Sequence, residues 1–378
     1  MPQTALGTNV FEEAIDRMKR VYSEGHRVVV SFSGGKDSGI CLEICLIAAR
    51  ETGRLPVEVS MRDEEIMFPG TFEYCERVVK RPEVKFDWAI AGQPIINVFN
   101  RESPYFWVFD NRLQPEQWVR QPPEFAVRIN ELNITALVNP TRFPPDEGKD
   151  LIVVIGLRVS ESINRRMGLY SSGGYLTKRD SLGMRKARPI YDWGNGDVWK
   201  AVHDNGWDYN DAYDVMCRLG VPKTELRIAP PTLTAAGINQ LILAAKAWPK
   251  WFEKVCKRLP GVRTAAQYGR HSVEPLRRFG ETWEDCYKRE CITDAPQWIA
   301  ERATALMNSR LKRHAKHSSQ PFPQNVMCPK CQGLSSWLRI ARAMYMGDPF
   351  SLKQQELTYI EPEFFREGAG TWGGKPTW

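Results

Sequence analysis

The sequence lacks a run of apolar residues long enough to cross a membrane. Its longest apolar runs, such as Val28–Val30 and Leu151–Ile155, fall far short of the roughly 18 to 20 residues that a membrane-spanning helix needs. Residues 1–10 also lack a basic segment followed by an apolar one, which is the pattern of an export signal. The sequence therefore predicts a protein that has no membrane partner and, by default, a cytoplasmic location.

Cysteine and histidine are both scarce, with nine cysteines and five histidines in 378 residues. An odd number of cysteines in a chain without an export signal argues against a disulfide framework. Metal binding or catalysis must therefore be considered for the cysteines that do not read as small core residues.

Composition and length place the chain among globular proteins. Hydrophobic residues make up 42% and charged residues 26% of the chain, which is enough apolar surface to bury a sizeable core. A chain of 378 residues exceeds the usual size of one domain, so we expect two domains or one large domain with an appendage.

Positive charge is concentrated in one region. The net charge is +7, and residues 246–318 carry 16 basic and 8 acidic residues. This excess is typical either of a solvated helical face or of contact with nucleic acid, so DNA or tRNA is a candidate partner.

The first half of the chain alternates between strand-like and helix-like segments. Strands are predicted at residues 27–32, 57–61, 84–90 and 151–155, and helices at 9–24, 38–52 and 71–80. This alternation indicates an α/β fold, a parallel twisted sheet of five or more strands with helices on both faces.

Two composition changes divide the rest of the chain. Residues 92–149 are rich in proline and aromatic residues and predict an insertion with short helices, which either covers the sheet edge or holds a substrate. Helical periodicity dominates after Trp193. We therefore predict a nucleotide-binding domain at residues 1–230 and a basic, helical, metal-binding region at residues 231–378 with an extended tail.

The segment Ser33-Gly34-Gly35-Lys36-Asp37-Ser38 directly follows an apolar strand and precedes a helix. Two glycines at such a turn let backbone N–H groups approach phosphate oxygens, and the positive end of the next helix points to the same place. Lys36 adds a cation. The spacing fits neither a Walker A loop nor a GxGxxG motif.

This segment resembles the PP-loop of the adenine nucleotide α-hydrolase superfamily, and specifically its phosphoadenosine phosphosulfate (PAPS) reductase-like branch. Three further stretches resemble elements of that branch. Asp63 and Glu64 end the second strand, residues 156–165 match the pattern Gly-x-Arg-x-x-Glu-Ser-x-x-Arg, and residues 188–199 match an element that contains Pro-Ile-x-Asp-Trp. The likeness spans roughly residues 11–226.

The resemblance implies cleavage of ATP between its α and β phosphates, to adenylylate or sulfurate an acceptor, or the use of PAPS. It implies that Lys36, Asp37 and Arg158 are catalytic and that Asp37 and Asp63 hold Mg²⁺, with Glu64 a further candidate. The implied nucleotide-binding residues are Ser33, Gly34, Gly35, Lys36, Asp37, Ser38, Asp63, Glu64, Gly156, Arg158, Glu161, Arg165 and Arg188. Glu161 and Asp192 could instead form ion pairs that orient Arg158 and Arg188.

The chain departs from the reductases of this branch, which carry a nucleophilic cysteine in a Cys-Gly-Leu-His type tail. No cysteine follows Cys331. The sequence more closely resembles divergent members from phages and mobile elements, including immunoglobulin-binding regulator A proteins, and more loosely the DNA phosphorothioation sulfurtransferase. Three functions stay open: an adenylylating or sulfur-transferring enzyme, a nucleotide-binding regulator that acts through a partner protein or DNA, and a PAPS reductase.

Four residues near the C-terminus have a spacing that suits a metal. His314 and His317 precede Cys328 and Cys331 in the pattern H-x₂-H-x₁₀-C-x₂-C, which could surround a tetrahedral Zn²⁺. Cys286 and Cys291 could instead join Cys328 and Cys331 in a four-thiolate site for zinc or an iron–sulfur cluster. A solvated helix end without metal is the third interpretation.

Overall fold

The computed structural model describes residues 7–91, 94–129, 137–181, 183–223, 225–228, 233–234, 237–331 and 335–347. These residues fall into two compact units. The first unit comprises those within Met1–Gln93 and Arg120–Pro230, and the second those within Pro94–Val119 and Pro231–Pro376. Pro94–Val119, which the sequence assigns to the nucleotide-binding domain, is thus grouped with the C-terminal region. The predicted extended tail lies, after Gly347, outside the described residues.

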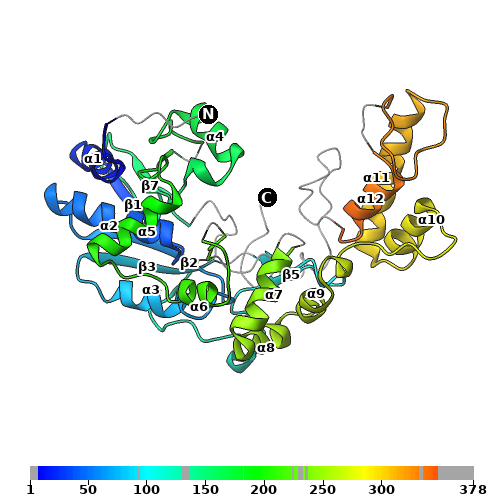
Figure 1. Ribbon diagram of the computed structural model, residues 1–378, viewed down its shortest axis with the longest axis horizontal. Helices are drawn as coiled ribbons and strands as arrows, with labels where there is room; N and C mark the ends of the chain where they lie inside the picture. The colour runs from blue at the N-terminus through cyan, green and yellow to red at the C-terminus, as the bar shows by residue number, and fades with distance from the viewer. Residues whose placement is uncertain are drawn as a thin grey trace. The chain divides into compact units, whose positions relative to one another are not determined.

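The described part of the first unit is built on a six-stranded sheet with the order β6-β3-β2-β1-β7-β8 (Figure 1). Every neighbouring pair is parallel. The strands are β1 (Arg27–Ser31), β2 (Val57–Asp63), β3 (Val84–Ala91), β6 (Val127–Ile129), β7 (Leu151–Val154) and β8 (Met184–Ala187). The predicted α/β fold with a parallel sheet of at least five strands is confirmed.

The helices of this unit lie before, between and after its strands along the chain. They are α1 (Val10–Ser23), α2 (Lys36–Glu51), α3 (Thr71–Val79), α4 (Ile163–Ser172), α5 (Asn195–Asn205) and α6 (Ala212–Arg218). Helix α1 begins where the Asn9 side chain accepts a hydrogen bond from the Phe11 N–H at 3.0 Å, which satisfies one free donor of the first turn. Helices α1, α2 and α5 pack against one another (Figure 1).

The apolar run of β1 is explained by burial on both faces of the sheet. Val28 and Val30 belong to the large core that includes α1 and α2, whereas Val29 belongs to a smaller cluster with Leu151 and Val153 of β7. Successive side chains of a strand point to opposite faces, so both faces of β1 are covered. This burial fixes the central strand that the PP-loop follows.

Sequence patterns missed the two edge strands. Strand β6 is three residues long and half exposed, and β8 has the charged residues Arg185 and Lys186 at its centre. A strand at the edge of a sheet has a neighbouring strand on one side only and is more exposed than a central strand. Its sequence therefore does not need a continuous run of apolar residues. Residues 92–149 also contain, in their described part, the short strands β4 (Pro94–Ile96) and β5 (Tyr105–Trp107) and the 3₁₀-helix η1 (Pro115–Gln117) in addition to β6.

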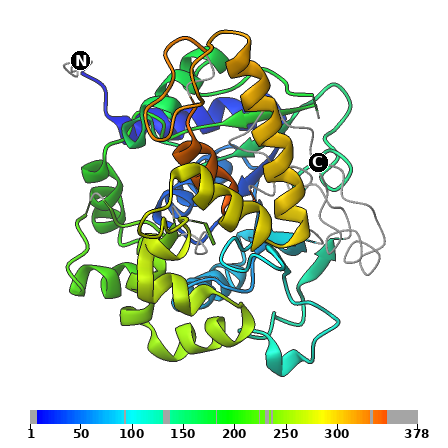
Figure 2. The ribbon, with the colours of Figure 1, turned by 90° about the vertical axis from the view of Figure 1, so that its right-hand side faces the viewer.

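The second unit combines the β4–β5 hairpin with helices. These are α7 (Ile238–Ala247), α8 (Pro249–Arg258), α9 (Val262–Tyr268), α10 (Trp283–Lys288), α11 (Gln297–Ala315) and α12 (Trp337–Met344). Helix α11 is the long golden helix of Figure 2, and α12 packs beside it. Tyr105, Phe106, Trp107 and Phe109 are all buried, so these aromatic residues of the proposed insertion serve packing. Among the described residues, no helix is long and apolar enough to span a bilayer.

Candidate functional site

The topology of the sheet marks one edge as a candidate binding site. From β1 the chain proceeds to β2 and β3 on one side, and it later places β7 and β8 on the other side. In open parallel sheets, ligands bind beyond the carboxyl ends of the two strands between which the order reverses. Here those strands are β1 and β7, and the segments that follow them are Phe32–Gly35 and Ile155–Arg158.

The PP-loop after β1 is held tightly at its glycines. Gly34 has a φ of 71°, and a Cβ there would lie only 2.7 Å from Cγ2 of Thr71. The Gly34 carbonyl accepts a hydrogen bond from Nδ2 of Asn210 at 2.9 Å. Helix α2 then begins at Lys36, with the Ser38 hydroxyl donating to the Gly35 carbonyl at 2.9 Å. The loop therefore presents the N-terminus of a 16-residue helix at the switch point.

Gly156 allows the loop after β7 to touch this turn. A Cβ on Gly156 would lie 2.8 Å from the carbonyl carbon and 2.9 Å from the carbonyl oxygen of Asp37. Backbone atoms cannot move aside as a flexible side chain does, so a residue without a side chain is required here.

Lys36 is buried in this loop. Its ammonium donates to the Leu226 carbonyl at 3.0 Å and to Oδ2 of Asp37 at 3.2 Å. Its backbone N–H donates to the Tyr213 hydroxyl at 2.8 Å. Burial lowers the pKa of Lys36, and Asp37 partly opposes that shift. The lysine is thus a desolvated cation held beside the start of α2.

A chain of ion pairs continues from Asp37. Arg158 is 1% exposed; its Nε donates to Oδ1 of Asp37 at 2.7 Å and its Nη2 to Oε1 of Glu161 at 3.2 Å. Glu161 also forms an ion pair with Arg165. Burial, and next the nearby Arg227, lower the pKa of Arg165. Glu161 therefore forms an ion pair that orients Arg158, which is one of the two roles that the sequence suggests for it.

Arg188 is placed differently. It follows β8 and is buried, and both its Nε and Nη1 lack a hydrogen-bond partner. Burial lowers its pKa. Asp192 does not orient it, because Asp192 pairs instead with Arg17 at 2.8 and 2.7 Å. An unpaired buried guanidinium is costly unless an anion binds it, so Arg188 stays a candidate for phosphate or sulfate binding.

Asp63 and Glu64 do not line the cavity at the PP-loop. The Asp63 carboxylate is fully buried; it accepts hydrogen bonds from Nε1 of Trp88 at 2.8 Å and from the Glu65 N–H at 2.9 Å, and it pairs with Arg120. Glu64 lies 3.4 Å from Nε of Arg62, and burial raises its pKa. Asp63 is thus held by Trp88 of β3 and by Arg120, and it is not in the lining of the cavity that Asp37 lines; its role as a magnesium ligand stays a prediction.

A cavity of about 310 Å³ lies at the PP-loop. Of the residues predicted from sequence, it is lined by Ser33, Gly35, Lys36, Asp37, Ser38, Gly156, Glu161 and Arg165. Ser31, Ile155, Tyr213, Arg227 and Ile228 complete the lining and were not predicted. Arg227 is a basic residue in a segment without helical periodicity, but no spacing rule connects it to residues almost two hundred positions earlier. Only the fold brings it there.

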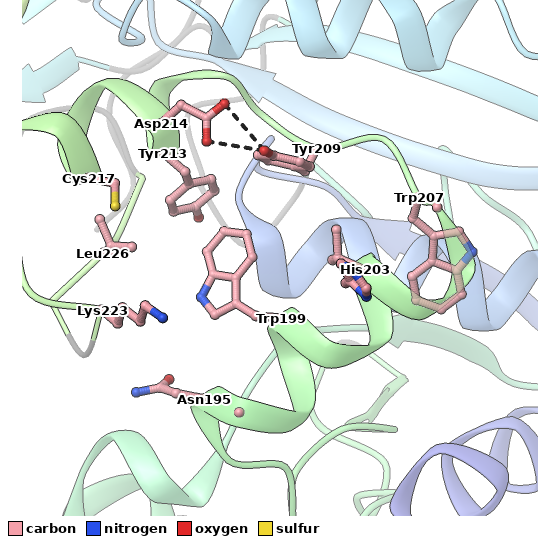
Figure 3. A pocket seen from close by; sticks show the side chains of 13 residues that line it. Asn195, Trp199, His203, Trp207, Tyr209, Tyr213, Asp214, Cys217, Lys223 and Leu226 are labelled. Carbon is pink, nitrogen blue, oxygen red and sulfur yellow. Dashed lines mark hydrogen bonds between the residues drawn. The ribbon is translucent and has the colours of Figure 1, made fainter.

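A second cavity, of about 760 Å³, shares Tyr213 with the first. Figure 3 shows Asn195, Trp199 and His203 along α5, Tyr213 and Cys217 on α6, and Tyr209 on the segment that precedes α6. The Trp199 ring packs edge-on against both tyrosine rings. The Tyr209 hydroxyl donates to the Asp214 carboxylate at 3.1 Å. This cavity offers aromatic surface with polar groups at its margin.

In the second unit, the structure brings together three of the predicted metal ligands. Ligand atoms of His314, Cys328 and Cys331 all lie within 4.8 Å of one another. His317 is exposed and is not part of this group. Cys286 and Cys291 are fully buried elsewhere in the unit, where the Cys291 thiol faces the Ala341 carbonyl at 3.7 Å.

Comparisons with known proteins give relatives for most of the chain. It is 27% identical over 380 residues to YbdN, an uncharacterized protein of Escherichia coli K12, and the match covers 91% of this chain and 89% of that one. Among solved structures, the Candida glabrata FMN adenylyltransferase is 13% identical with a TM-score of 0.34. That match covers 56% of this chain and 62% of the adenylyltransferase, which is less than two thirds of its length.

Two further solved structures are similar to this chain, also at low sequence identity. The PAPS reductase of Candida auris is 14% identical over 54% of this chain and 84% of that one, with a TM-score of 0.31. The U34-tRNA thiolase NcsA of Methanococcus maripaludis, solved with its [4Fe-4S] cluster, is 12% identical over 71% of this chain and 81% of that one, with a TM-score of 0.30.

The family model of the phosphoadenosine phosphosulfate reductase domain matches residues 27–220, from the start of β1 to just past the end of α6. This range contains the PP-loop, Gly156, Arg158 and Arg188, and it makes up more than half of the 378-residue chain. The chain therefore belongs to the phosphoadenosine phosphosulfate reductase domain family.

Proposed function

We propose that this chain binds ATP, or a close adenylyl nucleotide such as PAPS, at the PP-loop and cleaves ATP at the α-phosphate to adenylylate an acceptor. Where the acceptor is sulfurated, a separate sulfide donor then displaces AMP from it. One observation carries the proposal. Lys36, Arg165 and Arg227 line one cavity with the N-terminus of α2, at the switch point of a parallel sheet. Such a concentration of cations and backbone N–H groups suits a polyphosphate.

The reaction needs little covalent chemistry from the protein. A nucleophile of the acceptor attacks the α-phosphorus and loses its proton to solvent, while the bond to the bridging oxygen breaks and pyrophosphate leaves with the electron pair. Charge on the leaving phosphates rises during this step, and preorganised cations stabilise it. Lys36 has three N–H donors, of which Leu226 and Asp37 take two, so the third is available to a phosphate oxygen.

Magnesium would enter this site together with the phosphates. Mg²⁺ prefers phosphate and carboxylate oxygens and keeps several of its waters, so few protein ligands are needed. Asp37 is the predicted magnesium ligand that lines the cavity and would hold the ion there. The ion would supply further neutralisation of phosphate charge.

The cysteines beside the PP-loop do not suit the role of the nucleophilic thiol that PAPS reduction requires. Cys75 is the thiol that contacts the turn, since its Sγ would lie 3.2 Å from a Cβ on Gly34. Burial raises the pKa of Cys75 far above its usual range, and it raises that of Cys45 in α2 to about 12. Both are therefore protonated near neutral pH, and the protonated thiol is not the nucleophile.

The acceptor site is the larger cavity that shares Tyr213 with the nucleotide cavity. Trp199, Trp207 and Tyr209 give it ring surfaces, and Asn195 and Lys223 give it hydrogen-bond donors (Figure 3). A planar heteroaromatic group, such as a nucleobase of tRNA or DNA, would stack on such rings. The basic region at residues 246–318 supports a nucleic-acid acceptor through its charge.

Turnover of ATP with and without acceptors tests the proposal. Full-length protein is incubated with Mg²⁺ and ATP, alone and with bulk tRNA or DNA, and pyrophosphate release is followed. Lys36→Ala should lower the rate about 100-fold or more, because it removes a preorganised cation. Lys19→Ala, on the outer part of α1, is the matched control and should keep the full rate.

Nucleotide binding without product under every condition would overturn the catalytic proposal. It would favour the regulator instead, which needs binding but no turnover. The resemblance to immunoglobulin-binding regulator A proteins and to other phage proteins, which gives this competing expectation, stays a prediction.

A further inference from the structure

The loop between α11 and α12 is long and has little regular structure of its own. It runs from the end of α11 at Ala315 to the start of α12 at Trp337, and its described residues form only turns and bends. Backbone hydrogen bonds tie Pro323 and Gln324 of this loop to the start of α12, since the Trp337 N–H donates to the Pro323 carbonyl and the Leu338 N–H to the Gln324 carbonyl, both at 2.9 Å. Loops of this length without secondary structure of their own are uncommon in compact domains, and they are usually functional.

Cys328 and Cys331 lie in this loop and face the end of α11. Their sulfur atoms and a ring nitrogen of His314 all lie within 4.8 Å of one another. Cys331 is 2% exposed and His314 is 5% exposed. Three potential ligands thus converge in the interior of the second unit from two segments that are 14 residues apart in sequence at their closest.

The hydrogen bonding of His314 points to a ligand. Its Nε2 lies 2.8 Å from the Gln320 carbonyl oxygen, which can only accept, so Nε2 carries the proton. Nδ1 then carries the lone pair, and it is buried without a hydrogen-bond partner. Metal-binding histidines commonly donate their second ring N–H to a backbone carbonyl in this way, which fixes both tautomer and ring orientation.

Aromatic packing holds the His314 ring in place. The ring packs edge-on against Phe322 at 5.4 Å between centroids, and Phe322 packs in the same way against Trp337 at 5.3 Å. The ring is therefore fixed before any ligand binds, and its buried lone pair has a cost that a bound cation would remove.

We infer that the second unit binds a zinc ion through Nδ1 of His314 and the thiolates of Cys328 and Cys331. One imidazole with two thiolates is a donor set that suits tetrahedral Zn²⁺, whereas an iron–sulfur cluster commonly takes four thiolates. Cys328 is only half-buried, so a water molecule can complete the tetrahedron. The ion would fasten the loop to the end of α11, and this role is independent of the nucleotide site.

His317 is excluded from this ligand set by the end of the helix. Residues three apart share a face only while the helix continues, and α11 ends at Ala315. His317 lies past that end and is exposed. It therefore provides a matched control for His314, with the same side chain three residues away.

Metal analysis of the full-length protein tests the inference. Protein is loaded with zinc, dialysed, and measured by elemental mass spectrometry; wild type should retain one zinc per chain. His314→Ala and Cys328→Ser should each lose it, while His317→Ala and Cys256→Ser, a control in α8, should retain it. Cobalt in place of zinc should give the absorption bands of thiolate-bound tetrahedral Co²⁺, and Cys328→Ser should weaken them.

Four results would overturn the assignment. The wild-type protein could retain no zinc. Cys328→Ser and His314→Ala could both retain zinc fully. Intact-mass analysis could find Cys328 and Cys331 joined in a disulfide. Loss of zinc in His317→Ala would equally contradict the proposed ligand set. Cys328→Ser keeps the test valid if His314→Ala fails to fold, because Cys328 is only half-buried.

Discussion

The nucleotide cavity and the cysteine–histidine cluster are assembled by different means. At the PP-loop, segments from residue 31 to residue 228 meet because a parallel sheet brings the ends of β1 and β7 to one edge. Their charges are already paired with one another through Asp37 and Glu161. At the cluster, two nearby segments meet, and the buried Nδ1 of His314 has no partner. The first site is held by the fold, whereas the second is completed, in our proposal, by a zinc ion.

The largest effect is expected from removing the arginine that connects the pairs of the nucleotide cavity. Arg158→Ala leaves the carboxylates of Asp37 and Glu161 without their shared buried partner. Breaking one side of a buried ion pair costs about 3–5 kcal/mol, so we expect a loss of that order in the free energy of unfolding. Urea denaturation measures it, with the exposed Arg166→Ala as control. Equal stability of both variants would contradict the account.

A smaller effect is expected from a single methyl group at Gly156. Gly156→Ala places a Cβ 2.8 Å from the Asp37 backbone and should cost about 1–3 kcal/mol in unfolding free energy, with weaker nucleotide binding. Gly168→Ala in α4 meets nothing within 4 Å and should instead stabilise the protein by about 0.5–1 kcal/mol. Opposite signs in thermal unfolding would confirm that the two loops must touch.

Zinc removal should separate the two sites. If the loop depends on the ion and the PP-loop does not, stripping zinc with a chelator, which is dialysed away before Mg²⁺ and ATP are added, should increase proteolysis within residues 318–335 and leave nucleotide affinity unchanged. Limited proteolysis with mass spectrometry reports the first change, and titration calorimetry with ATP reports the second. Loss of nucleotide affinity on chelation would show that the sites are not independent.

The smallest effect concerns acid stability in the second unit. The hydrogen bond from Arg289 lowers the pKa of Glu281 to about 2. Because this pKa is lower in the folded state than the usual value of about 4.3, the pair stabilises the protein above that value and is lost as pH falls toward 2. Glu281→Gln should therefore flatten the decline of the melting temperature across this range, and an unchanged decline would contradict the pairing.

The sequence predicted those parts of the fold and site that depend on local pattern. The apolar run of β1, the glycine turn and the helix that begins at Lys36 could be predicted because they are contiguous. Tyr213 and Arg227 could not, since they reach the cavity only because α6 and the segment after it return to the PP-loop. The pairing of Asp63 with Arg120 was hidden for the same reason, because the partner lies 57 residues away.

At the cluster, the cysteine pair was visible from its spacing, but the choice of histidine was not. His314 and His317 are equivalent in the sequence pattern, and the position at which α11 ends decides between them. Helix ends are among the least certain features of a sequence-based prediction. The free nitrogen of His314 is a property of packing, which no pattern records.

The identity of the products formed from ATP tests the central claim most directly. Protein, Mg²⁺ and ATP labelled at the α-phosphate are incubated with tRNA or DNA, and the products are separated by chromatography. The account predicts label in AMP or on the acceptor, with one pyrophosphate released for each. Label in ADP with release of phosphate would place the cleavage at the γ-phosphate and contradict the proposed chemistry.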